Sequence, residues 1–194
     1  MALVTVKPTR IDIAIADEIA DHTNSYLERT AAALTWGGDE HVLFALAIGG
    51  WLCAQLRRPQ ARPVANHVLV VSAVTAVLPH LLKSTFNQTR PDRLTVRGHR
   101  RGVPISGKPH DAFPSGHAAH MGALASVAEV LPPHPRRLVR GIAVGLSLTR
   151  IALLAHWASD VVVGFTLGLF VERLLRSWTL TASVRKRLNT RRPP

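Results

Sequence analysis

The stretch VANHVLVVSAVTAVLPHLL, at residues 64–82, contains no aspartate, glutamate, lysine or arginine. A helix needs about 20 predominantly apolar residues to cross the hydrocarbon core of a bilayer. This stretch has that length and composition, and it is the one apolar segment of the chain that meets the criterion by itself. We therefore expect a transmembrane helix at residues 64–82.

Four other apolar segments flank this stretch, but each is shorter or carries ionisable side chains. Charges within a membrane helix are costly, so they lie at helix ends or face the interior of a bundle. We expect an all-α, membrane-embedded helical bundle with about five transmembrane helices. A soluble all-helical bundle with buried apolar helices is the alternative. The four segments are residues 41–55, residues 115–131 with Glu129, residues 138–155 with Arg140 and Arg150, and residues 160–175, which end near Glu172 and Arg173.

The chain of 194 residues suits a single compact domain, because hydrophobic cores usually divide only above about 250 residues. Between Asp12 and Trp36, apolar residues recur at helical spacing with acidic residues among them. This pattern predicts an amphipathic interfacial helix within residues 1–40. Residues 41–177 are then the membrane-embedded domain, and residues 178–194 are a basic tail attracted to anionic lipid.

Lysine and arginine outnumber aspartate and glutamate by 24 to 12, which gives a net charge of +12. Such a balance fits nucleic acid, an anionic membrane surface or a phosphorylated substrate. If all five segments span, the arginine-rich turns at residues 57–62 and 132–137 and the basic tail share one side, which the positive-inside rule makes cytoplasmic. Cys53 is the lone cysteine of the chain, so it forms no intramolecular disulfide and no convincing zinc site.

Three polar motifs stand where apolar segments begin or end on the opposite side of the predicted bundle. Because they emerge on the same side, their side chains can converge at one site. His156 and Asp160 are four residues apart, so they share one face if the helix continues through them. The motifs are Lys83, Arg90 and Pro91; Phe113, Pro114, Ser115, Gly116 and His117; and Thr149, Arg150, His156 and Asp160.

The chemistry of these residues points to a phosphoryl group. Lys83, Arg90 and Arg150 would surround a small dianion together with the N-terminus of the third segment, where backbone N–H groups bind anions. His117 and His156 are suited to nucleophilic and acid–base work. The remaining histidines are assigned no role, because a lone histidine in an apolar helix is usually hydrogen-bonded core.

The motifs resemble the signature of the type 2 phosphatidic acid phosphatase superfamily, which includes bacterial acid phosphatases, undecaprenyl pyrophosphate phosphatases and vanadium haloperoxidases. The family pattern is K-x6-R-P, then P-S-G-H, then S-R-x5-H-x3-D. The chain matches it from Lys83 to Asp160, with Thr149 in place of the family's serine. Threonine keeps the hydroxyl donor, so we expect the contact to survive.

The resemblance implies a metal-independent membrane phosphatase without a cofactor, which hydrolyses a lipid phosphate monoester or a (poly)prenyl pyrophosphate through a phosphohistidine. It implies that His156 attacks phosphorus, that Asp160 fixes the tautomer of His156, and that His117 protonates the departing oxygen. Its implied partners are the lipid substrate and the membrane, with no nucleic acid. It also suggests a bacterial inner membrane, with the site facing the periplasm. The implied phosphate-binding residues are Lys83, Arg90, Ser115, Gly116 and Arg150.

Other functions are compatible with the same residues. A soluble or peripheral acid phosphatase would act on small phosphomonoesters, and a haloperoxidase would hold vanadate at the same site. A basic binding module would instead contact nucleic acid or acidic lipid without catalysis. That module would use Arg97, Arg100, Arg101 and Lys108. The sequence specifies neither the lipid nor the oligomeric state.

Overall fold

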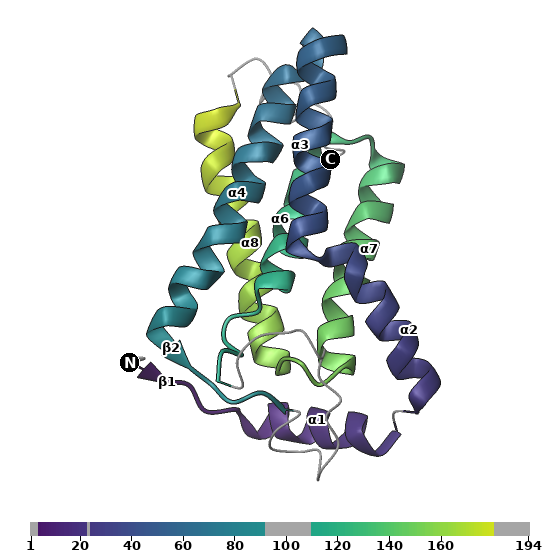
Figure 1. Cartoon of the computed structure of the whole chain (residues 1–194), viewed down its shortest axis with the longest axis vertical. Helices are drawn as coiled ribbons and strands as arrows, with labels where there is room; N and C mark the ends of the chain where they lie inside the picture. The colour runs from purple at the N-terminus through teal and green to yellow at the C-terminus, as the bar shows by residue number, and fades with distance from the viewer. Residues whose placement is uncertain (1–3, 23, 92–109, 181–194) are drawn as a thin grey trace.

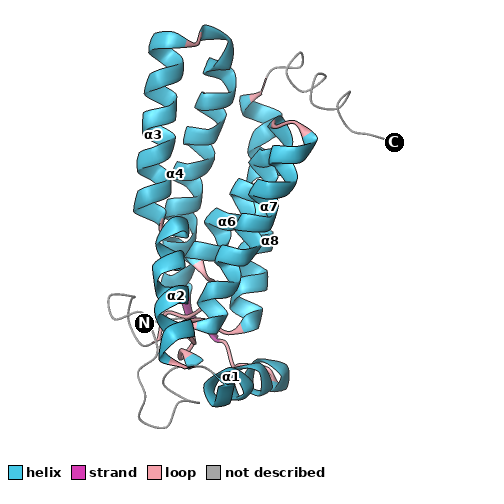
Figure 2. Ribbon diagram, turned by 90° about the vertical axis from the view of Figure 1, so that its right-hand side faces the viewer, coloured by secondary structure: helices cyan, strands magenta, loops and turns pink. Residues whose placement is uncertain are grey.

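The structure is a computed structural model that describes residues 4–22, 24–91 and 110–180. Its main body is a bundle of long helices that run roughly alongside one another (Figures 1 and 2). The expected helical bundle is confirmed, and each of the five apolar segments forms a helix. These helices are α3 (Glu40–Arg57), α4 (Arg62–Thr85), α6 (Gly116–Val127), α7 (Pro133–Ala152) and α8 (Ala158–Thr179).

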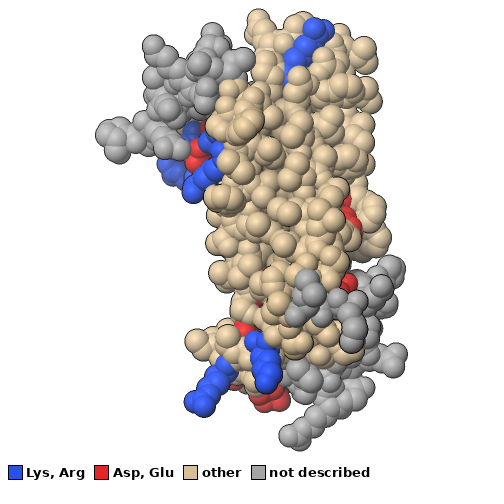
Figure 3. Space-filling view, turned by 90° about the vertical axis from the view of Figure 1, so that its left-hand side faces the viewer, with Lys and Arg blue, Asp and Glu red and all other residues tan. Residues whose placement is uncertain are grey.

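One helical stretch in the described part of the chain, Pro59–Thr85, is long and apolar enough by itself to cross a membrane. It contains residues 64–82, the apolar stretch expected to form a transmembrane helix. On the face shown in Figure 3, charged side chains gather toward the two ends of the molecule, and the surface between them is almost free of charge. Large apolar side chains are exposed on several helices, including Leu56 at 80%, Leu138 at 65% and Phe170 at 64%. Such an apolar surface is suited to contact with lipid.

The N-terminal region differs from the single amphipathic helix predicted between Asp12 and Trp36. It forms two helices, α1 (Arg10–His22) and α2 (Ser25–Thr35), followed by the short 3-10 helix η1 (Trp36–Gly38). A second helix begins because the Asn24 side chain accepts hydrogen bonds from the amides of Tyr26 and Leu27, which is a typical N-cap. Helix α1 lies across one end of the bundle (Figures 1 and 2).

Two short strands add to the helical fold. Strand β1 (Val4–Thr5) pairs in parallel with β2 (Phe86–Asn87), which directly follows α4. Directly after β2, Gln88 forms an isolated parallel bridge with Asp111, in which the amide of Gln88 donates to the His110 carbonyl and the amide of Ala112 donates to the Gln88 carbonyl. Residues 86–88, between Lys83 and Arg90 of the first motif, are thereby joined to β1 on one side and to the segment before the second motif on the other.

Helices α6 and α8 approach so closely that their backbones touch. A Cβ added at Gly168 would lie 1.9 Å from the Ala119 carbonyl oxygen, and one at Gly164 would lie 2.3 Å from the Ser115 carbonyl oxygen. Gly122 of α6 meets the backbone of α8 equally closely. Small residues of this kind allow helix backbones to approach within a membrane. The crossing sets the position of the α6 N-terminus relative to the start of α8.

A buried polar network joins the helices at the end of the bundle opposite α1. The Glu172 carboxylate lies 2.9 Å from His67 Nε2, accepts from the Ser126 hydroxyl at 2.5 Å and accepts from Arg176 at 2.7 and 2.8 Å. Arg176 also pairs with Glu129. Because each charge has an opposite charge or a hydrogen-bonding partner, the network is tolerated where a lone charge would be costly.

The glycine crossing yields a stability prediction. Gly168→Ala should lower the free energy of unfolding by at least about 2 kcal/mol, because the new methyl group overlaps backbone that cannot rotate away. Gly141 of α7 is the matched control, since nothing lies within 4 Å of its added Cβ. Gly141→Ala should leave stability unchanged or raise it by up to about 1 kcal/mol. Thermal unfolding in detergent measures both, and a fully stable Gly168→Ala protein would contradict the close crossing.

Candidate active site

His156 lies in a turn between α7 and α8. Helix α7 ends because Leu154 adopts a φ of 52°, and the amides of Ala155 and His156 both donate to the Arg150 carbonyl. Helix α7 ends at Ala152 and α8 begins at Ala158, so no single helix runs through His156 and Asp160, and the turn brings these residues together instead. Leu153 and Leu154 are both buried, so the chain turns where two large apolar side chains enter the core. We call residues 153–157 the His156 turn.

The His156 ring is held by a backbone carbonyl. Its Nδ1 lies 2.7 Å from the Ala112 oxygen and 3.7 Å from Asp160 Oδ2. A carbonyl only accepts hydrogen bonds, so Nδ1 carries the proton and Nε2 keeps its lone pair. The Ala112 carbonyl therefore fixes the tautomer of His156, a role that the family resemblance assigned to Asp160. Sequence reasoning missed Ala112 because a backbone contact leaves no side-chain signal.

Asp160 is fully buried within the first turn of α8. Its Oδ2 accepts from the Trp157 amide at 3.0 Å. With the amide nitrogen of Gln88 turned toward it, Gln88 donates to Oδ1 at 2.6 Å and to Oδ2 at 3.2 Å. The carboxylate therefore fastens the helix start to the extended segment after β2. Sequence reasoning did not identify Gln88. It lies two residues before Arg90, and residues two positions apart in an extended chain lie on the same face.

Two of the three predicted phosphate-binding cations contact the acidic residue Asp111. Arg90 donates to Asp111 Oδ1 at 2.9 Å and to the Ala155 carbonyl at 2.7 Å, and Lys83 Nζ lies 3.8 Å from Asp111 Oδ2. Arg90 is thereby tied to the His156 turn. Asp111 was missed by sequence reasoning, although it stands only two residues before Phe113 and the second motif.

The third cation, Arg150, lies next to the N-terminal region of the chain. Its Nη1 lies 3.4 Å from the Thr35 hydroxyl, and its buried Nε has no hydrogen-bond partner in the part of the chain that the structure describes. The hydroxyl of Thr149 lies 2.6 Å from the Leu146 carbonyl and 3.2 Å from the Thr35 hydroxyl. The Thr149 hydroxyl, which replaces the hydroxyl of the family's serine, therefore makes these two contacts. One of them is to Thr35, which lies outside the motif.

The three cations act together on His156. Burial lowers the pKa of its imidazole well below 6.5, and the charges of Arg90, Arg150 and Lys83 lower it further. The buried ring is therefore neutral at physiological pH, as a nucleophilic imidazole must be. A bound anion would offset the mutual repulsion of these cations.

The N-terminus of α6 faces the same region. Ser115 is its N-cap and accepts from the Ala118 amide at 3.4 Å, while its own amide donates to the Asp160 carbonyl at 3.2 Å. Gly116 is the first helical residue. Pro114 directly precedes this cap. The amides of the first turn give this end its affinity for anions.

His117 occupies a different position from His156. A Cβ added at Gly38 would lie 2.3 Å from His117 Nε2, so the ring packs against η1. Within residues 4–22, 24–91 and 110–180, Nε2 has no hydrogen-bond partner, and no hydrogen bond joins His117 to His156. Gly38 was not identified from the sequence, because nothing in the motifs predicts where this ring rests.

The structure thus gathers most of the predicted residues at the end of the bundle near α1. Lys83, Arg90 and Arg150 act on His156, and Ser115 meets Asp160. In the described segments no group of three or more histidine, cysteine, aspartate or glutamate side chains could hold a metal ion. The basic residues between 97 and 108, and those of the predicted tail beyond residue 180, lie outside the described residues.

Three cations, a helix N-terminus and a neutral imidazole lie at one end of this helix bundle. Helical proteins with such a site form a class that is suited to bind a phosphoryl group. A family model described as the PAP2 superfamily matches residues 64–183, which is more than half of the chain. The chain belongs to the PAP2 superfamily.

Curated relatives include two bacterial proteins named lipid A 1-phosphatase. The chain is 33% identical over 101 residues to that of Rhizobium johnstonii and 30% identical over 106 residues to that of Rhizobium etli. These matches cover 52% and 54% of this chain, but only 41% and 46% of the relatives. The matched region is thus less than half of each relative's length.

Two solved structures share the fold. One is the crystal structure of LpxE from Aquifex aeolicus, with a TM-score of 0.66 and 19% identity over 89% of this chain and 99% of that one. The other is the first transmembrane PAP2 type phosphatidylglycerolphosphate phosphatase from Bacillus subtilis, with a TM-score of 0.64 and 22% identity over 87% and 84%. The chain therefore shares its arrangement of helices with these two structures, of which the second is described as a transmembrane PAP2 type protein.

The contact with Ala112 predicts a specific state of His156. Its ring should be the neutral tautomer protonated on Nδ1, and it should stay neutral as the pH falls through 6.5, because its pKa is lowered. Nitrogen-15 spectra of histidine-labelled protein measure this, and the resonances lost in His156→Ala identify the ring. A tautomer protonated on Nε2, or a titration near the usual pKa of about 6.5, would contradict the geometry.

Proposed function

We propose that the protein is a membrane lipid phosphatase that hydrolyses a phosphate monoester or pyrophosphate on a lipid through a phosphohistidine. One observation carries the proposal. His156 presents a neutral imidazole with Nδ1 held by a carbonyl, and three cations act on that ring. Phosphoryl transfer needs positioning and charge stabilisation more than covalent chemistry from the protein. This arrangement supplies both.

In the first step, Nε2 of His156 forms a bond to phosphorus while the bond from phosphorus to the ester or pyrophosphate oxygen breaks. His117 donates a proton to the departing oxygen. Lys83, Arg90 and Arg150, with Ser115 and the Gly116 amide, hold the non-bridging oxygens. Asp160, 3.7 Å from Nδ1, stabilises the positive charge that develops on the ring.

In the second step, water attacks the phosphohistidine and releases inorganic phosphate together with neutral His156. His117 takes the proton from that water, since it gave its own to the leaving group. His117 is hydrogen-bonded to none of these groups in the structure, which fits the general observation that catalytic hydrogen bonds often tighten only when substrate is bound. No metal ion takes part in either step.

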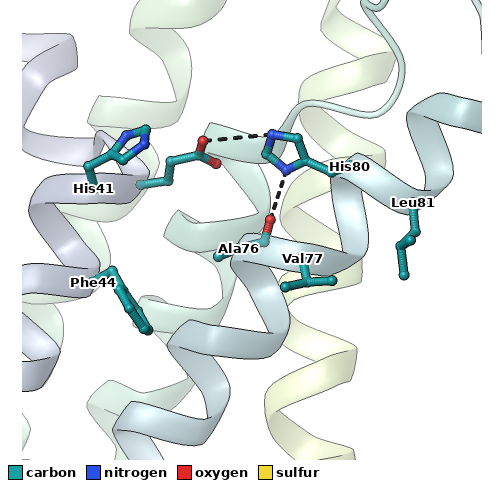
Figure 4. Close-up of a pocket in the computed structure, with 7 residues that line it drawn as sticks. His41, Phe44, Ala76, Val77, His80 and Leu81 are labelled. Atoms are coloured by element: carbon teal, nitrogen blue, oxygen red, sulfur yellow. Dashed lines mark hydrogen bonds and ion pairs between the residues drawn. The ribbon is translucent and has the colours of Figure 1, made fainter.

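A lipid substrate is supported by a pocket close to Lys83. The pocket has a volume of about 400 Å³ and lies between α3 and α4. Figure 4 shows apolar side chains such as Phe44 and Val77 beneath His80, whose Nε2 lies 3.8 Å from Glu40. Glu40 also acts electrostatically on Lys83. The tail of a lipid can occupy the apolar part while its phosphate reaches the cations.

The relatives favour a phosphorylated glycolipid or glycerolipid within this class. Two are named lipid A 1-phosphatase and one structural neighbour is a phosphatidylglycerolphosphate phosphatase. We place the protein in the bacterial inner membrane with the site toward the periplasm. The arginine-rich turns at residues 57–62 and 132–137 lie at the end opposite the site (Figure 1), as the positive-inside rule requires.

The phosphohistidine predicts the outcome of removing one imidazole. His156→Ala should abolish phosphate release from lipid phosphates and pyrophosphates by the detergent-purified protein, because the nucleophile is lost. His134→Ala is the control and should retain full activity, since His134 is exposed at the far end of the bundle. Excess chelator should leave wild-type activity intact. Activity that survives in His156→Ala, or that requires a metal ion, would refute the mechanism.

The pocket between α3 and α4 predicts an effect that depends on the lipid tail. Val77→Trp should raise KM for a long-chain lipid phosphate, because the larger ring fills the space for the tail. The KM for a small soluble phosphomonoester should change little. Val144→Trp, at a residue of α7 that is 47% exposed, is the control and should affect neither substrate. Equal effects of Val77→Trp on both substrates would argue against a tail in this pocket.

A further inference from the structure

The first turn of α8 has no capping side chain of its own. Its N-cap is Trp157, whose indole N–H is only a donor and is directed to the Thr89 carbonyl at 2.8 Å. The Asp160 side chain turns back to the Trp157 amide. The first amides of a helix have no partner within the helix, so the amide of Ser159 needs an acceptor from another segment.

Asp12 of α1 is that acceptor. Its Oδ1 accepts from the Ser159 amide at 2.8 Å and its Oδ2 accepts from the Ser159 hydroxyl at 2.8 Å. The amide and hydroxyl of Thr9 donate to Oδ2 at 2.9 and 2.8 Å. Asp12 is only 2% exposed, so its carboxylate is buried with four donors. A negative charge at a helix N-terminus is also favoured by the helix dipole.

Helix α1 packs on the segments that hold His156. Ala16, one turn after Asp12, forms a buried cluster with Ala112, Leu154 and Trp157. Ala112 provides the carbonyl bonded to His156 Nδ1, and the other two belong to the His156 turn. The carboxylate of Asp12 and the apolar face of α1 therefore support the same few residues.

We propose that Asp12 is a positioning residue for the reaction proposed above. It holds the start of α8, and with it the His156 turn and Asp160, in the geometry that directs Nε2 of His156 toward the phosphate. Asp12 itself touches neither the reacting atoms nor the phosphate-binding cations. It lies outside residues 64–183, which the family model matches, so the family motifs do not assign it this role. The inference depends on the proposed function.

Asp12→Ala tests the role directly. Removing an outer partner of a metal-ligating residue typically costs about 10–100-fold in activity, and by analogy we expect kcat per folded molecule to fall by that factor with KM nearly unchanged. Asp17→Ala is the matched control, because Asp17 is an exposed aspartate on the same helix. It should keep the wild-type kcat. A role confined to folding would lower the yield of folded protein and leave kcat unchanged, and that outcome would overturn the proposal.

Ser159→Ala tests whether Asp12 acts through α8. This change removes the hydroxyl donor and keeps the backbone amide, so it should lower kcat several-fold in the wild-type protein. It should have no further effect in Asp12→Ala, because residues that share one interaction are not additive. Additive losses in the double variant would mean that Asp12 does not act through Ser159, and would overturn the proposal.

A spectroscopic measurement separates this inference from the proposed function. If the wild-type protein releases no phosphate, the proposed function fails, but the position of His156 can still be measured. The nitrogen-15 resonances of His156 should shift in Asp12→Ala and stay unchanged in Asp17→Ala. A His156 resonance that is identical in Asp12→Ala and the wild type would overturn the positioning role.

Discussion

The backbone contact between α6 and α8 is the constraint on which the site depends. Because Gly164 and Gly168 carry no Cβ, α8 lies directly against the carbonyl oxygens of Ser115 and Ala119. The same approach lets the Ser115 amide donate to the Asp160 carbonyl. The N-terminus of one helix and the first turn of the other are thus held by backbone atoms, which have far less freedom than side chains. A site that stabilises a developing charge needs this kind of rigidity.

The charged groups around this rigid site determine the protonation state of His156 and the kind of ligand that the site can bind. Three cations act electrostatically on His156 at an end of the bundle where burial weakens solvent screening, and the nearby Asp111 carboxylate balances only part of their charge. The imidazole stays neutral because a further positive charge there would be costly. In the proposed reaction, a phosphate dianion would relieve the repulsion among the cations and meet a nucleophile that is already deprotonated. Binding and activation of the nucleophile therefore arise from one charge distribution.

The sequence was sufficient for those parts of the fold that depend on apolar length and motif spacing. It located the five long helices and the residues around His156, because helix ends on one side of a bundle must meet. It did not predict the division between α1 and α2, since one side chain, Asn24, begins a new helix. It also missed Ala112, which acts through its carbonyl, and Asp12, which looks like an ordinary polar residue of an amphipathic helix until α1 docks.

Asp111 has a consequence for the end of the catalytic cycle. Its carboxylate contacts two of the cations, Arg90 and Lys83. An anion at these side chains competes with a tethered carboxylate, whose effective concentration is high because it belongs to the same chain. In the proposed reaction, inorganic phosphate would therefore be held less tightly than three cations alone would hold it. Under the proposed function, Asp111 would compete with the product for these cations, which would favour rapid clearance of the site and weak product inhibition.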